Sequence, residues 1–108
     1  MHRTFAVACL CTQLLAQTER VNKEPELGTV TWQRDLPAAF AQAQKGGKPV
    51  FLLFQEIPGC DTCTGFGKDV LSHALLAAAI EQCFVPVVAR NNVEGAEKDI
   101  LQRYQEPA

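Results

Sequence analysis

The sequence lacks the features that mark membrane and nucleic-acid-binding proteins. No apolar run reaches the roughly 18 residues needed to cross a bilayer, so we expect no membrane span. Ten Lys and Arg against twelve Asp and Glu give a formal net charge of −2, and no basic stripe is present, so we expect no nucleic-acid partner. Neither repeats nor low-complexity tracts occur. What remains is an ordinary globular composition, 47% hydrophobic and 20% charged in 108 residues, which suits one domain at most.

The first 28 residues differ from the rest of the chain. A short basic start is followed by a mostly apolar stretch over 5–16 and a polar stretch over 17–28, the outline of a secretory signal with a linker. A cut after Ala16 would place Leu14 where a small residue is preferred, so a disordered or weakly helical extension is the alternative. The protein is exported or periplasmic in the first case and cytoplasmic in the second. Cys9 and Cys11 lie in this segment and are not counted as ligands or disulfide partners.

A Cys-x-x-Cys pair, Cys60 and Cys63, carries the strongest chemical signal. It follows the apolar run 49–54 and opens a helical pattern, the context of a redox-active pair. Residues three apart lie on one helix face, so the two sulfur atoms are near enough to close a disulfide. Unpaired N–H groups and the helix dipole favour a thiolate in the first turn. We therefore expect Cys60 to be the nucleophile and Cys63 the resolving thiol.

Other interpretations of the pair stay open. A structural disulfide, inert buried thiols or a zinc site would use the same spacing. A structural zinc site takes four ligands, and the sequence offers neither a second such pair nor two His at ligand spacing. We therefore expect no metal site and no cofactor. His73 is expected to be a mid-helix or kink residue rather than a base or ligand, and Cys83 a buried free thiol.

The chain after residue 28 alternates between predicted strands and helices. Asp35 is a predicted N-cap, and Gly46-Gly47 a helix end. The predicted elements are strand 28–32, helix 35–47, strand 49–54, a helix from 60 to about 80 with an irregularity near 69–73, strand 84–89 and helix 94–104. The side chains expected on the buried face of the helix from 60 to about 80 are Cys63, Phe66, Val70, Leu71, Leu75, Leu76, Ala79 and Ile80. The alternation predicts an α/β fold with parallel strands and the Cys pair just past the carboxyl end of one of them.

Several of these segments resemble a bacterial thioredoxin-like domain. The resemblance covers residues 29–108 and depends on Trp32, the helix 35–47, the strand 48–54, Pro58-Gly59-Cys60-x-x-Cys63 and the strand 84–87. It implies a thioredoxin-like β-α-β-α-β-α order and thiol–disulfide exchange by Cys60 and Cys63. Its partners would be protein thiols or disulfides and an unidentified redox partner. The sequence departs from the family by stopping before the usual C-terminal β-hairpin and last helix, so residues 29–108 are expected to be an incomplete domain of low stability.

The residues around the pair also depart from the family pattern. Gly59 replaces the usual Trp, Asp61-Thr62 replaces Gly-Pro, and Phe54 stands where many members have a buried acid, with Glu56 the nearest carboxylate. Asp61 is expected to place its negative charge beside the Cys60 sulfur and to make the pair reducing. A binding or scaffold module whose Cys pair does not react, or an inactive fragment, remains the alternative function.

Overall fold

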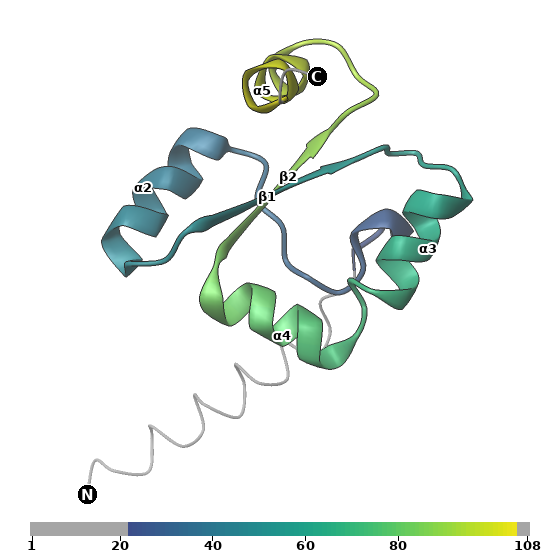
Figure 1. The fold of residues 1–108 in the computed structure, drawn as a ribbon, viewed down its shortest axis with the longest axis horizontal. Helices are drawn as coiled ribbons and strands as arrows, with labels where there is room; N and C mark the ends of the chain where they lie inside the picture. Colours follow the sequence, from purple (N-terminus) through teal and green to yellow (C-terminus); the bar gives the residue numbers. More distant parts are fainter. Residues whose placement is uncertain (1–21, 106–108) are drawn as a thin grey trace, which may run out of the picture.

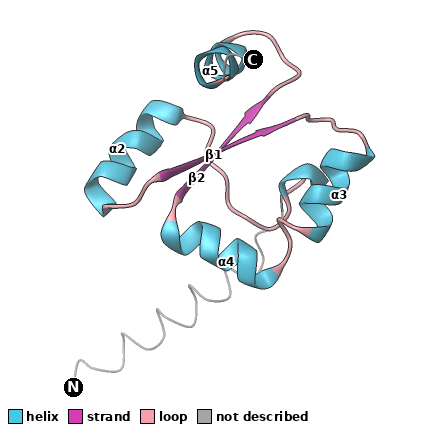
Figure 2. Cartoon of the chain, in the orientation of Figure 1, coloured by secondary structure: helices cyan, strands magenta, loops and turns pink. Residues whose placement is uncertain are grey.

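The structure, a computed structural model, describes residues 22–105. The predictions for residues 1–21, including Cys9 and Cys11, lie outside this part. The element order is η1 (Pro25–Leu27), α2 (Leu36–Gly46), β1 (Val50–Gln55), α3 (Asp61–Asp69), α4 (Ala74–Cys83), β2 (Val85–Arg90) and α5 (Ala96–Tyr104). Figures 1 and 2 show the strands at the centre, with α2 and α5 on one side and α3 and α4 on the other. The predicted α/β class is confirmed.

The two strands β1 and β2 run parallel, as predicted. Their register pairs Val50 with Val85 and Gln55 with Arg90. Residues 85–89 of β2 are all buried, because helices cover both faces of this strand. One face packs Val85 and Val87 against α2, and the other packs Val88 with Leu27 and Ile57. In residues 22–105 no helix is long and apolar enough to cross a membrane.

The strand predicted over residues 28–32 is reduced to a single bridge, in which Gln33 pairs with Val87. The backbone donors of the predicted strand bond elsewhere. The Thr29 N–H donates to Leu71 O at 3.1 Å and the Thr31 N–H to Glu81 Oε1 at 2.7 Å. Since these two backbone donors bond outside a ladder, the segment has the residue composition of a strand but does not pair as one.

The first long helix, α2, begins and ends where the sequence predicts. The Asp35 carboxylate accepts from the Ala38 N–H at 3.1 Å, which is an N-cap. Gly47 ends the helix in the left-handed conformation at φ 66°, which a glycine adopts without steric cost. Both ends of this helix are therefore set by local chemistry.

The irregularity expected near residues 69–73 is a complete break between α3 and α4. Leu71, 1% exposed, is buried as expected, and the break resets the helical period so that Ala77 is the buried residue of α4. The expectation that Phe66, Leu75 and Leu76 are buried is wrong: they are 40%, 76% and 46% exposed. A continuous helix would have kept Leu75 and Leu76 on the apolar face of α3, whereas the separate helix α4 turns these two side chains outward. Phe66 lies within α3, before the break, and is exposed there.

Candidate functional site

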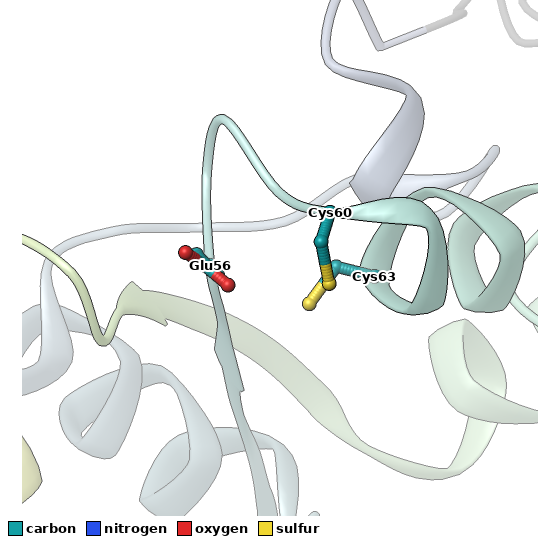
Figure 3. A group of neighbouring side chains, drawn as sticks. All are labelled: Glu56, Cys60 and Cys63. Carbon is teal, nitrogen blue, oxygen red and sulfur yellow. The ribbon is translucent and has the colours of Figure 1, made fainter.

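The Cys pair lies at the carboxyl end of β1, where the sequence places it. β1 ends at Gln55, and a short turn leads to Cys60, the N-cap residue of α3. Cys63 lies in the first turn of the same helix. Figure 3 shows both cysteines at the start of α3, opposite Glu56 on the segment that leaves the strand.

The turn before Cys60 is held from two sides by hydrogen bonds to the buried Glu26 and to the exposed Asn92. The Gly59 N–H donates to Glu26 Oε2 at 2.8 Å, and Glu26 is only 3% exposed. The Ile57 N–H donates to Asn92 Oδ1 at 3.2 Å, while Asn92 Nδ2 donates back to Ile57 O at 3.3 Å. These bonds join η1 and the segment after β2 to the turn, so the backbone before Cys60 has fixed partners.

Only glycine fits at position 59 without a steric clash. A Cβ there would lie 2.5 Å from Cys63 Cβ and 2.5 Å from Glu56 O. Both distances are far below ordinary contact. The departure from the family at this residue therefore reflects a close packing of the turn against the pair.

The side-chain amide of Gln55 connects β1 with η1 and with the start of α3. Gln55 Nε2 donates to Glu26 O at 2.8 Å and makes a longer contact with Cys63 O at 3.5 Å. One buried amide therefore links the end of β1 to both η1 and the first turn of α3. Sequence analysis missed Glu26 and Gln55, because neither stands in a motif and both act through contacts distant in the chain.

The three cysteines in the described part of the chain are free thiols. Cys60 is exposed and Cys63 is half-buried. Hydrogen bonds lower the pKa of Cys60, first from the Cys63 backbone N–H, then from the Thr62 N–H and hydroxyl. These are unpaired donors of a helix N-terminus, the cause that the sequence predicts. Desolvation and the negative charge of Glu56 oppose them and raise the pKa.

Glu56 is the carboxylate that acts on Cys60. One of its oxygens and the sulfur atoms of Cys60 and Cys63 lie within 4.8 Å of one another, a group that could hold a metal ion. The expectation for Asp61 is wrong in this respect: the charge that opposes the Cys60 thiolate comes from Glu56, and Asp61 is an exposed residue of the first turn. Glu56 precedes Cys60 by only four residues, and this short spacing in the sequence could have indicated that its carboxylate lies near the Cys60 sulfur.

Cys83 and His73 lie outside this group. Cys83 ends α4 and is exposed, so the prediction of a buried thiol is wrong. His73 is the N-cap residue of α4, with no side-chain cap bond, and is exposed.

Three comparisons with known proteins were made. The bifunctional protein FolD of Acinetobacter baumannii is 28% identical over 86 residues, a match that covers 80% of this chain and 29% of FolD. The chain thus spans less than a third of that relative's length. No solved structure gives a significant match. The model of a thioredoxin-like family matches residues 31–107, most of the chain and all of its strands and helices from α2 onward, and the chain therefore belongs to the thioredoxin-like family.

Proposed function

We propose that this chain is a thiol–disulfide oxidoreductase that acts on protein disulfides through Cys60 and Cys63. One observation carries the proposal: an exposed thiol at the N-cap of α3 lies beside a half-buried thiol one turn further on, at the carboxyl end of a parallel strand. The lowered pKa of Cys60 supports this assignment, because the thiolate is the reacting species. Membership of the thioredoxin-like family supports it independently.

The reaction proceeds in two exchange steps. The Cys60 thiolate attacks one sulfur of the substrate disulfide, the substrate S–S bond breaks, and the departing thiolate takes a proton from water. Cys63 then loses its proton to water and attacks Cys60 Sγ in the mixed disulfide, which releases the second substrate thiol. Two electrons pass from the protein dithiol to the substrate, and an external dithiol regenerates the reduced pair.

The contacts around the pair suit this division of roles. Cys60 is accessible to a large substrate, whereas Cys63 is half-buried beside Gly59 and the Gln55 amide. An incoming disulfide therefore meets Cys60 first. Once the mixed disulfide has formed, Cys63 is already close to the sulfur that it must attack.

The test is reduction of insulin by dithiothreitol, followed by turbidity, with EDTA present. All variants carry Cys9→Ser and Cys11→Ser, so that these two thiols do not contribute. Cys60→Ser is expected to reduce the rate to that of dithiothreitol alone. Cys83→Ser is the matched control, an exposed cysteine outside the group, and is expected to leave the rate unchanged.

A second measurement separates the two roles. Cys63→Ser is expected to trap a mixed disulfide on Cys60 that is visible by mass spectrometry. If the parent protein does not accelerate insulin reduction, and Cys60 and Cys63 alkylate at equal rates, the proposal is wrong and the chain is a non-catalytic thioredoxin-like module.

A further inference from the structure

The ligand atoms of Glu56, Cys60 and Cys63 form a compact acidic group at the start of α3. They lie within 4.8 Å of one another and come from two segments, the end of β1 and the first turn of α3 (Figure 3). Among residues 22–105, Glu56 makes no ion pair with a Lys, Arg or His. When both cysteines are thiolates, three negative groups face one another.

The donor set identifies the class of ion. Calcium and magnesium take oxygen ligands, whereas two thiolates with a carboxylate suit zinc. Zinc binds sulfur at about 2.3 Å and carboxylate oxygen at about 2.0–2.2 Å, so tetrahedral ligands around it lie roughly 3.5–3.8 Å apart. The observed spread of up to 4.8 Å needs a closure of about 1 Å, which side-chain rotation of exposed Cys60 and half-buried Glu56 supplies.

The backbone that joins the ligands is held in place before any ion binds. Between Glu56 and Cys60, the Ile57 N–H donates to Asn92 and the Gly59 N–H to the buried Glu26 carboxylate. The two cysteines are placed by α3 itself. A site with three placed ligands and an exposed side keeps its fourth position open, unlike a structural zinc site, which is closed by four protein ligands.

We propose that the reduced protein binds one Zn²⁺ through Glu56, Cys60 and Cys63, with the fourth position open to water, and that the bound ion blocks disulfide exchange. Binding releases the two thiol protons and transfers no electrons. Conversely, oxidation of the pair by a substrate disulfide removes both thiolates and releases the ion. The blocking of exchange rests on the proposed function, whereas zinc binding itself does not.

The binding test uses Co²⁺ as a spectroscopic probe on the full chain with Cys9→Ser and Cys11→Ser. The reduced protein is expected to develop sulfur-to-cobalt charge-transfer absorption that saturates at one equivalent and disappears when Zn²⁺ is added. The same protein oxidised with diamide is expected to show no absorption. Because this control uses the same protein, a difference in absorption cannot result from misfolding of a variant.

Variants then test the ligands. Glu56→Gln is expected to weaken Zn²⁺ binding by about tenfold or more. Loss of a group that only orients a metal ligand already lowers metal affinity by about this factor, and Glu56 is proposed to be a ligand itself. Cys83→Ser is the matched control and is expected to bind as the parent does. Three results would each overturn the site. The first is the absence of a cobalt band, and the second is a loss of binding in Cys83→Ser. The third is an equal affinity of Glu56→Gln and the parent for Zn²⁺, which a site made of the two thiolates alone would give.

Activity separates this inference from the proposed function. In EDTA the parent reduces insulin if the proposed function holds, whatever happens with zinc. Without EDTA or dithiothreitol, one equivalent of Zn²⁺ is expected to suppress single-turnover reduction of insulin by the prereduced parent protein, and to do so less in Glu56→Gln. An unchanged rate with zinc bound would overturn the blocking role, while a protein that binds cobalt but is inactive in EDTA would refute only the proposed function.

Discussion

Gly65 and Gly67 of α3 provide a matched test of how the helix that carries the Cys pair is packed. A Cβ on Gly67 would lie 2.0 Å from Pro25 O, 2.5 Å from the Glu26 carbonyl carbon and 2.7 Å from Glu26 Cα. All three are backbone atoms of η1, so no side-chain rotation relieves the contact. Around Gly65, a Cβ meets nothing within 4 Å. The two positions share a helix and differ in what faces them.

The expected stabilities follow from two opposing effects. Alanine in place of glycine favours a helix by about 1 kcal/mol, so Gly65→Ala is expected to raise the free energy of unfolding by up to that amount. In Gly67→Ala the same gain opposes an overpacking cost of roughly 2–3 kcal/mol, because α3 must move away from η1. We therefore expect Gly67→Ala to lose about 1–2 kcal/mol, the difference between typical overpacking and helix-propensity effects.

The assay is urea unfolding of the reduced protein, followed by Trp32 fluorescence. With a denaturant slope of about 1–3 kcal/mol per molar, the midpoints of the two variants should differ by about 1 M or more, in opposite directions from the parent. If both alanines stabilise the protein equally, the contact between α3 and η1 is absent in solution. The description of how α3 is docked would then be refuted.

Three further predictions concern charge and redox chemistry. Because the pKa of Cys60 is lowered, the pH midpoint of its alkylation rate should lie below the value of about 8.5 for a free thiol. Glu56→Gln should lower this midpoint further, because it removes a negative charge that opposes the thiolate. A midpoint equal to that of free cysteine, measured in EDTA, would contradict this. Glu56→Gln should raise the reduction potential of the Cys60–Cys63 pair in equilibration with glutathione, since Glu56 opposes the Cys60 thiolate and loss of its charge stabilises the reduced form; an unchanged potential would refute that role. Arg90 lowers the pKa of Glu97, so this pair contributes stability above the unfolded value of about 4.3 that is lost as the pH falls through the folded value. Glu97→Gln should therefore cost roughly 1 kcal/mol near pH 7 and less below about pH 4, and a pH-independent cost in urea unfolding would contradict this.

Features governed by local chemistry were predicted well. Asp35 caps α2 and Gly47 ends it, because a carboxylate next to free N–H groups and a glycine free to take a positive φ act within one turn. The continuous apolar runs became the parallel pair β1 and β2. The lowered pKa of Cys60 likewise comes from donors two and three residues away.

Errors arose where partners distant in the chain compete for the same groups. Residues 28–32 have strand composition, yet their donors bond to Leu71 and Glu81, so a single bridge at Gln33 remains. Leu75 and Leu76 follow the expected apolar period, but the break after α3 reset it and left them exposed. The sequence predicted an irregularity near residues 69–73, but periodicity does not show that it ends one helix and starts another with a different buried face.

At the Cys pair, too, the sequence determines the local effects, whereas the tertiary structure determines the contacts between distant segments. The order of residues 58–63 is enough to place an accessible thiol at a helix N-terminus, because backbone donors and the helix dipole act locally. The order of residues alone does not show that Glu56 faces both sulfur atoms, or that Glu26, more than 30 residues before Gly59, holds the turn. Those contacts exist only after β1, η1 and α3 pack together, since their distances are set by packing and not by spacing along the chain.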